Sequence, residues 1–120
     1  MKDQGLYLKT CNTCMRILGE LNLPEEYELQ EVKSAPATAE QIDELAKMAG
    51  CYEALFNRRS KKYRELGLHE QDLSEDEYRK HLLEKYTFLK RPVFVIDGEL
   101  YMGNSKKTVE AAKEKLKNRK

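Results

Sequence analysis

Hydrophobic residues in the first third of the chain predict a strand, a helix and a second strand. The apolar run Leu6–Leu8 is typical of a buried central strand, and a cysteine follows within three residues. The next apolar residues are spaced as on one face of a helix that Pro24 closes, namely Met15, Ile17, Leu18 and Leu21. Residues 27–33 alternate imperfectly between apolar and polar side chains, which indicates a second strand. This order predicts a βαβ unit with a parallel strand pair.

The middle of the chain, about residues 35–90, is polar and carries helical signals. Two capping boxes predict helix starts, one at Thr38–Gln41 and the other at Ser74–Glu77. Apolar residues follow them at helical spacing: Ile42, Leu45, Ala46 and Ala49 after the first box, and Tyr78, Leu82, Leu83 and Tyr86 after the second. Gly50 is expected to end the first helix, and Leu66–Leu68 to separate two short ones. We therefore expect a helical insert here.

The last third carries the strongest strand pattern. Val93–Ile96 is continuously apolar, and the Asp97–Gly98 dipeptide suits a two-residue type I′ hairpin turn. Residues 100–102 then return antiparallel, and a final amphipathic helix is marked by Val109, Ala112 and Leu116. These elements predict an α/β fold in a single domain of residues 1–120. Its core is a four-stranded mixed sheet (βαβ plus ββα) flanked by helices, with the insert between strands 2 and 3.

Composition and charge limit what the chain could do. The 120 residues are 40% hydrophobic and 36% charged, which is sufficient for one soluble domain. The 22 Lys and Arg against 21 Asp and Glu give a net charge of +1, whereas a general nucleic-acid binder carries a clear basic excess. No apolar run approaches the length of a membrane helix, and the first residues lack a signal-peptide pattern. We therefore expect a cytoplasmic protein with no membrane anchor and no direct nucleic-acid partner.

The most informative chemical feature is the pair Cys11 and Cys14 at the predicted start of the first helix. Unpaired backbone N–H groups and the helix dipole at such a position stabilise thiolate over thiol, and thiolate is the reactive form. We therefore expect Cys11 to be the nucleophile. Cys14, one turn deeper on the same face, is the expected resolving thiol, which attacks a mixed disulfide formed at Cys11. Lys9 and Arg16 flank the pair and could add positive potential.

Two other interpretations of the cysteine pair stay open. The two residues could be inert core cysteines. They could also bind zinc, but zinc usually needs four ligands, and the other candidates are scattered singly: Cys51, His69 and His81. We favour redox or thiol chemistry and expect no metal.

Two further segments could contribute to such a site. Pro92 precedes a buried strand and could be cis or trans; in a turn that faces Cys11, Arg91 could bind an oxyanion or stabilise the thiolate. Residues 58–64 hold five basic residues, including Arg58 and Arg59. This cluster could bind an anion or could be a solvated face.

These residues together resemble the arsenate reductase-like (ArsC/Spx-type) family of the thioredoxin superfamily. The resemblance rests on motifs in a characteristic order: Tyr7-x-x-Thr10-Cys11-Asn12-Thr13-Cys14-x-Arg16, Leu55-Phe56-Asn57-Arg58-Arg59-Ser60, Tyr63–Leu68, Leu89-Lys90-Arg91-Pro92 and Gly103-Asn104. It implies a thioredoxin-like sheet with a helical insert and a cis Pro92.

For the arsenate reductase branch, the resemblance implies that Cys11 attacks arsenate and that Arg91 is one of three arginines that hold the oxyanion. Asn57 and Gly103 stand where the other two arginines are expected. It also implies that no cofactor is bound, and that glutathione or a dithiol protein of the glutaredoxin or thioredoxin type supplies electrons. We expect a monomer.

For the Spx-like branch, the resemblance implies a transcription regulator that binds the C-terminal domain of the RNA polymerase α-subunit. The pair Cys11 and Cys14 would then be a disulfide switch, and Gly50 falls where that branch has a glycine at its polymerase-contacting surface. A thiol oxidoreductase is our leading hypothesis, and the regulator is the alternative.

Overall fold

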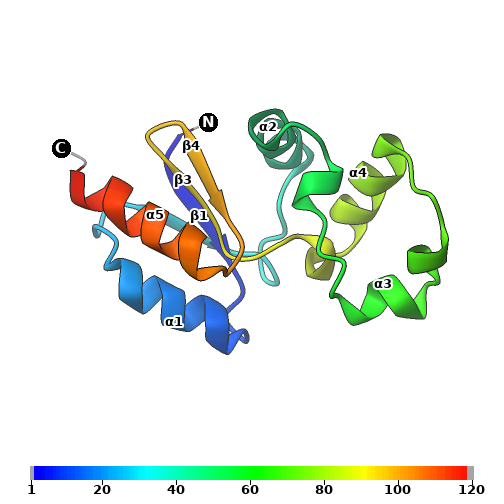
Figure 1. Cartoon of the computed structure of the whole chain (residues 1–120), viewed down its shortest axis with the longest axis horizontal. Coiled ribbons are helices and arrows are strands. Elements are labelled where there is room, and N and C mark those ends of the chain that lie inside the picture. Colours follow the sequence, from blue (N-terminus) through cyan, green and yellow to red (C-terminus); the bar gives the residue numbers. More distant parts are fainter. Residues whose placement is uncertain (1, 119–120) are drawn as a thin grey trace. The chain divides into compact units, whose positions relative to one another are not determined.

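Residues 2–118 are described by the computed structural model, and they divide into two units. The first unit contains residues up to Ala35 and from Arg91 onward, and it carries the sheet. The second unit, Pro36–Lys90, contains only helices, turns and one isolated β-bridge. Figure 1 shows the first unit in blue, cyan, orange and red and the second mostly in green and yellow. Within the described residues, no helix combines the length and the apolar character that a membrane crossing requires.

The first unit is built on a four-stranded mixed sheet. The strand order is β2 (Glu28–Glu31), β1 (Gln4–Tyr7), β3 (Val93–Ile96) and β4 (Glu99–Met102). Strand β1 runs parallel to β2 and antiparallel to β3, and β3 is antiparallel to β4. The predicted mixed sheet and parallel βαβ pair are therefore confirmed. Leu8 lies beyond β1, although the apolar run predicts it in the strand, because its carbonyl accepts the N–H of Cys11 in a turn at 3.0 Å.

The hairpin between β3 and β4 also follows the prediction. Asp97 has φ +50° and Gly98 has φ +79°, and a type I′ turn requires positive φ at both central residues. The residue types at these positions tolerate that conformation, which other side chains rarely adopt. The turn thereby fixes the register in which β4 returns along β3.

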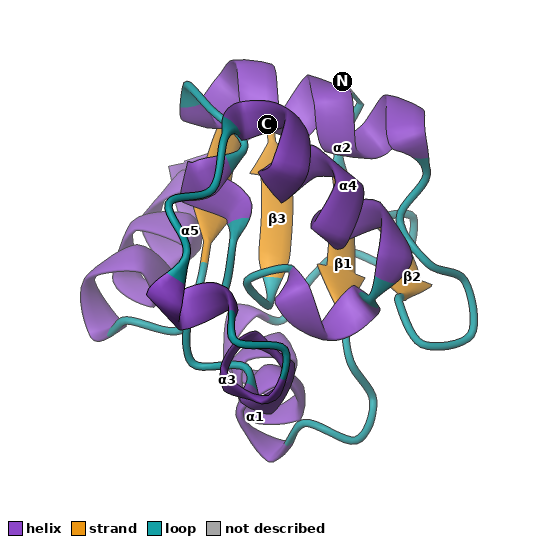
Figure 2. Cartoon of the chain, turned by 90° about the vertical axis from the view of Figure 1, so that its right-hand side faces the viewer, coloured by secondary structure: helices purple, strands orange, loops and turns teal. Residues whose placement is uncertain are grey.

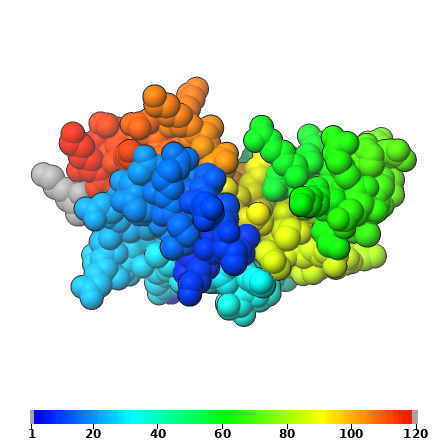
Figure 3. All heavy atoms as spheres, turned by 90° about the horizontal axis from the view of Figure 1, so that it is seen from below, coloured from blue at the N-terminus to red at the C-terminus, as the bar shows by residue number. Residues whose placement is uncertain are grey.

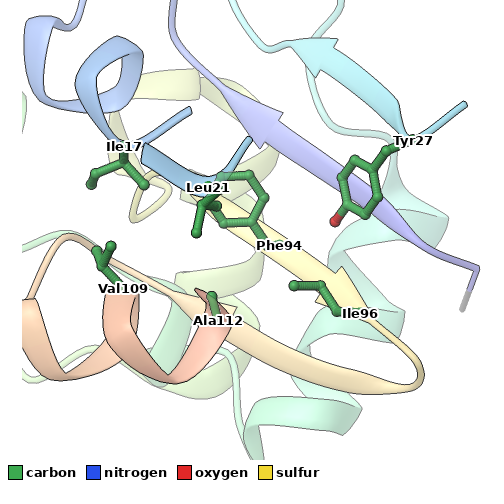
Figure 4. Packing of buried hydrophobic residues seen from close by; sticks show 7 residues of the cluster. All are labelled: Ile17, Leu21, Tyr27, Phe94, Ile96, Val109 and Ala112. Carbon is green, nitrogen blue, oxygen red and sulfur yellow. The ribbon is translucent and has the colours of Figure 1, made fainter. Parts of the chain in front are cut away.

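Helices α1 (Asn12–Leu21) and α5 (Lys106–Asn118) lie side by side over one face of the sheet (Figure 1). Their inward residues form one cluster with the sheet, shown in Figure 4: Ile17, Leu21, Tyr27, Phe94, Ile96, Val109 and Ala112. Figure 3 also shows that N-terminal and C-terminal segments pack together, since blue N-terminal atoms border orange C-terminal atoms. Helix α1 ends at Leu21, before the expected stop at Pro24, because Asn22 already takes a left-handed conformation with φ +48°.

Tyr27 connects this core to the strands. Its ring is buried, and its hydroxyl lies 2.7 Å from the carbonyl oxygen of Gln4 and 2.9 Å from that of Val95. A buried hydroxyl without a partner is costly, so the two carbonyls allow the ring to be buried without that penalty. The contact also holds the neighbouring strands β1 and β3 at a fixed distance.

The second unit consists of short helices (Figure 2). They are α2 (Ala39–Ala49), α3 (Lys61–Glu65), α4 (Glu75–Glu84) and the 3₁₀ turns Glu53–Leu55, Leu68–Glu70 and Tyr86–Phe88. Both predicted capping boxes are present: Thr38 accepts the N–H of Gln41 at 3.1 Å, and Ser74 that of Glu77 at 3.3 Å. Gly50 ends α2 as predicted.

One helical prediction in this unit is wrong. The apolar spacing predicts that Tyr86 continues the face of the helix that begins after Ser74, but it lies in the following 3₁₀ turn. The reason is that Lys85 adopts extended angles (φ −137°, ψ 121°), which stops α4 at Glu84. The apolar spacing alone does not reveal this interruption, since a 3₁₀ turn also places a side chain every third residue on one face.

The core of the second unit is aromatic. Phe56 stacks on Phe88 at 4.9 Å between ring centroids and meets Tyr78 edge-on at 5.1 Å. A β-bridge between Phe56 and Leu89 brings the two segments together. Offset and edge-on aromatic pairs add to the burial energy, so this group fixes the centre of the unit.

Candidate active site

Cys11 is the N-cap residue of α1. Its backbone is extended (φ −93°, ψ 108°), and its Sγ accepts a hydrogen bond from the backbone N–H of Cys14 at 3.5 Å. An N-cap is normally Ser, Thr, Asp or Asn, whose oxygen satisfies one of the unpaired N–H groups of the first turn. Here a sulfur takes that place. Its side chain is part-exposed, so an external reactant can reach it.

The loop before Cys11 is fixed by a residue that the sequence analysis missed. Glu31, at the end of β2, accepts the backbone N–H of Lys9 at 3.0 Å and that of Ser34 at 2.8 Å. These backbone hydrogen bonds lower the pKa of the Glu31 carboxyl. Nothing in the sequence marks Glu31, since its role depends on the pairing of β2 with β1. It positions the turn that delivers Cys11 to the helix start.

The surroundings of Cys11 favour its thiolate. Partial burial alone would raise the pKa of its thiol. The hydrogen bonds from Cys14 and from the backbone of Thr13, together with the positive charge of Arg91, outweigh that effect and lower the pKa below its ordinary value. The direction agrees with the general behaviour of cysteines at helix N-termini.

Cys14 has the opposite character. It lies on the buried face of α1 with Ile17 and Leu21, and its side chain is fully inaccessible. Burial and, to a smaller extent, the nearby sulfur of Cys11 raise the pKa of the Cys14 thiol to about 11, while a backbone hydrogen bond with Leu8 and the charge of Arg91 partly oppose the shift. The two thiols of the motif are thus differentiated: one is accessible and acidic, and the other is buried and protonated.

Arg91 and Pro92 belong to the same unit as the cysteines. The charge of Arg91 lowers the pKa of both thiols, which places its guanidinium in their electrostatic environment. The Arg91–Pro92 peptide bond is cis, as the family resemblance implies. The carbonyl of Pro92 accepts the N–H of Gly103 at 2.9 Å, which ties the start of β3 to the segment after β4.

Gly103 itself leaves an open space. Its φ is +94°, a conformation that glycine adopts at low cost, and no atom lies within 4 Å of the position that a Cβ would occupy. No side chain therefore projects from the residue that contacts Pro92. An arginine at this position would have to adopt an unfavourable backbone conformation.

Lys9 and Arg16 have no comparable role in the structure. Both side chains are exposed, and the main causes of the pKa shifts of the cysteines are burial, local hydrogen bonds and the charge of Arg91. Among residues 2–118, neither side chain has a hydrogen-bond or ion-pair partner. Their expected contribution to an anion site remains a prediction.

Arg58 and Arg59 belong to the second unit. Arg58 forms an ion pair with Glu53 and a hydrogen bond of 3.3 Å with the hydroxyl of Tyr78. Arg59 is exposed, and its backbone N–H is accepted by the side-chain oxygen of Asn57 at 3.1 Å. The structure thus brings Cys11, Cys14 and Arg91 together in the first unit, and it places the other two arginines in a separate unit.

The sequence profile of the ArsC family matches residues 6–112 of the chain. The chain belongs to the ArsC family. Proteins of this family have the thioredoxin-like fold, and the mixed sheet with its flanking helices is the ArsC version of that fold. No curated protein matches the chain.

Solved ArsC-related structures agree with this assignment. An ArsC family related protein from Bacteroides fragilis is 24% identical, with 93% of this chain and 98% of that chain covered and a TM-score of 0.76. An arsenate reductase from Vibrio cholerae is 19% identical (95% and 98% covered, TM-score 0.71). An arsenate reductase (ArsC) related protein from Brucella melitensis is 25% identical (92% and 93% covered, TM-score 0.69).

In this ArsC-family chain, all three cysteines are free thiols. Cys51 lies in the second unit, whereas Cys11 and Cys14 lie in the first. Within residues 2–118, no group of three or more His, Cys, Asp and Glu side chains is arranged to hold a metal ion. Cys11 and Cys14 are two free thiols three residues apart at the start of α1, and the pKa of Cys11 is lowered while that of Cys14 is raised.

Proposed function

We propose that this ArsC-family protein is a thiol oxidoreductase that reduces a disulfide, with Cys11 as nucleophile and Cys14 as resolving thiol. The Cys11 thiolate attacks one sulfur of a substrate disulfide, and the other sulfur leaves as a thiolate. Cys14 then loses its proton to solvent or to the departing thiolate and attacks the Cys11 sulfur. This releases the second substrate thiolate and leaves a Cys11–Cys14 disulfide. Two electrons pass from the protein to the substrate, and glutathione or a dithiol protein restores the pair.

The observation that carries the proposal is the hydrogen bond from Cys14 N–H to Cys11 Sγ, 3.5 Å long. A donor aimed at the sulfur stabilises the charged form that reacts, and the part-exposed position admits a substrate. The cysteine three residues later lies one turn along the same helix, within reach of a mixed disulfide on Cys11.

The high pKa of Cys14 suits the order of the two steps. Part of the shift to about 11 comes from the neighbouring Cys11 sulfur. Once Cys11 is joined to a substrate sulfur, its negative charge is gone and that part of the shift disappears. The pKa of Cys14 therefore falls only after the first step, so the resolving thiol becomes more nucleophilic when its target exists.

The set of charges in the first unit supports an organic disulfide over arsenate as substrate. A multiply charged oxyanion is normally held by several charge-assisted hydrogen bonds. Arg91 is a cation whose charge lowers the pKa of both thiols, and Gly103 presents no side chain beside Pro92. The mixed disulfide of glutathione with a small thiol needs fewer such contacts. Arsenate is the second substrate to test.

The experiment compares three cysteine variants with the wild type in the reduction of such a mixed disulfide, with glutathione or glutaredoxin as donor. Cys11→Ser is expected to abolish turnover. Cys14→Ser is expected to accumulate a substrate adduct on Cys11, detectable by intact mass. Cys51→Ser is the matched control and should turn over like the wild type. Full activity of Cys11→Ser would contradict the proposal.

A further inference from the structure

An exposed methionine lies one helical turn after the proposed nucleophile. The backbone N–H of Met15 bonds to the carbonyl of Cys11 at 3.1 Å, which closes the first turn of α1. Helical side chains lean toward the N-terminal end of their helix, so the side chain of Met15 extends toward the turn that begins at Cys11. This side chain is 43% exposed. In the described part of the chain, the other large apolar side chains this exposed are Leu29 and Leu66, and neither belongs to α1.

The side of α1 on which Met15 lies follows from the contacts of the rest of the helix. Ile17 and Leu21 point into the core cluster (Figure 4), and Glu20 faces α5, where it pairs with Lys113 at 3.7 Å. Successive helical residues are about 100° apart around the axis, which separates Met15 from each of these three α1 residues by more than about 100°. Met15 therefore lies on a side of α1 that faces neither the core nor α5.

Gly19 keeps this side of the helix open. It comes one turn after Met15, and no atom lies within 4 Å of the position that its Cβ would occupy. A larger side chain at this position would lean back toward Met15 and cover part of it. Cys11, Met15 and Gly19 thus follow one another at four-residue spacing, as a reactive sulfur, an apolar contact and an open space.

We propose that Met15 is a specificity-determining residue, and that it selects disulfide substrates in which one thiol component carries an apolar group beside its sulfur. The inference rests on the proposed function. Methionine is flexible and polarisable, so its side chain adapts to apolar groups of different shape. Contact with such a group removes apolar surface of both partners from water, which a polar thiol component cannot do.

The contact acts in the first step of the reaction. The Cys11 thiolate attacks the sulfur of the apolar thiol component, and glutathione leaves as a thiolate. The apolar component, now joined to Cys11, packs against Met15. Cys14 then displaces it as a thiolate, which leaves the Cys11–Cys14 disulfide, and two molecules of glutathione reduce this disulfide and become oxidised glutathione.

The test uses the full chain and two mixed disulfides of glutathione, each with a short peptide that contains one cysteine. Leucines flank the cysteine in one peptide and serines in the other. With glutathione as donor, the wild type is expected to show a kcat/KM about five- to tenfold higher for the leucine peptide.

Three variants assign this preference to a residue. Met15→Gln keeps the length and the helix propensity of the side chain and should remove most of the preference, by lowering kcat/KM mainly for the leucine peptide. Met15→Leu keeps an apolar side chain and should retain the preference. Leu29→Gln is the matched control, since it removes a side chain that is 46% exposed in β2, and it should also retain the preference.

A preference that is lost in Met15→Gln and kept in Met15→Leu and Leu29→Gln supports the proposal. Equal kcat/KM for the two peptides in the wild type would overturn it and leave the proposed function intact. A preference that survives Met15→Gln, or that Leu29→Gln reduces equally, would have the same meaning. The absence of turnover with both peptides would contradict the proposed function itself, and the inference with it.

Discussion

The backbone N–H of Cys14 points at the sulfur of Cys11 across 3.5 Å, so one cysteine of the pair helps to hold the charge of the other. The Cys11 sulfur therefore has two roles. It is the N-cap acceptor of α1 and also the proposed nucleophile. Whatever changes the charge of this sulfur changes the stability of the helix start as well as the reactivity.

The first prediction is a pH-dependent stability of the reduced protein. The pKa of Cys11 is lowered in the folded state, whereas an unfolded cysteine titrates near ~8.5. The contribution of Cys11 to the free energy of unfolding is thus fully present above pH ~8.5. It is lost as the pH falls through the lowered pKa that Cys11 has in the folded protein. Cys14 acts in the other direction: its pKa is raised to about 11, so its contribution is present below ~8.5 and is lost as the pH rises toward 11.

These two effects predict a maximum near pH ~8.5 in the part of the stability that the pair contributes. Thermal unfolding of the reduced wild type at a series of pH values measures it against the Cys11→Ser/Cys14→Ser variant, and comparison with Cys11→Ser isolates the part that Cys11 contributes. The wild type should gain stability relative to Cys11→Ser as the pH rises toward ~8.5. A constant difference between the two proteins below that pH would contradict the assignment.

The second prediction concerns Arg91. Its positive charge lowers the pKa of Cys11, so Arg91→Ala should raise that pKa and slow alkylation of Cys11 at neutral pH. Arg91→Lys keeps the charge and should retain most of the rate. Arg16→Ala, which removes an exposed charge from α1, should leave the rate unchanged. Equal slowing by the Arg16 and Arg91 changes would show that Arg91 has no specific role.

The third prediction tests how the sheet is held together. Tyr27→Phe removes the buried hydroxyl that lies against the carbonyls of Gln4 and Val95, and it should lower the free energy of unfolding by about 1–2 kcal/mol. Tyr101→Phe is the comparison, since its hydroxyl pairs with the exposed Glu99 and its loss should cost less than ~0.5 kcal/mol. Urea denaturation measures both variants. Equal losses would argue against the role of Tyr27.

The fourth prediction concerns two glycines. Gly103 has φ +94° and free space around it, so Gly103→Ala should cost about 1–2 kcal/mol from backbone strain alone. Gly19, inside α1, has equal space and ordinary helical angles, so Gly19→Ala should stabilise by up to ~1 kcal/mol. Opposite signs in thermal unfolding are expected. A stabilising Gly103→Ala would show that an arginine there costs no backbone energy.

Much of the fold could be predicted from local patterns in the sequence. The capping boxes at Thr38 and Ser74, the Asp97–Gly98 hairpin and the end of α2 at Gly50 each depend on a few adjacent residues with strong backbone preferences. The cysteine pair could be placed at a helix start for the same reason. Such features are encoded where they occur, and the structure confirms them.

The rest depends on contacts between distant residues. Glu31 fixes the loop before Cys11 because β2 pairs with β1, and no local pattern marks that role. The basic cluster suggests an anion contact for Arg58, but its partners Glu53 and Tyr78 come from different parts of the second unit. The end of α4 before Tyr86 likewise reflects how the segment packs and not its apolar spacing.

The central claim is that the two cysteines are differentiated, and the most direct measurement is the pKa of each thiol in the same sample. The side-chain ¹³Cβ chemical shifts of Cys11 and Cys14 in the reduced protein are followed by NMR at a series of pH values, because this signal reports ionisation of the buried Cys14 as well as of Cys11. The account predicts that Cys11 titrates below the ordinary cysteine value of ~8.5 and that Cys14 titrates far above it, near 11. An unshifted Cys11, or a Cys14 that ionises first, would contradict the account.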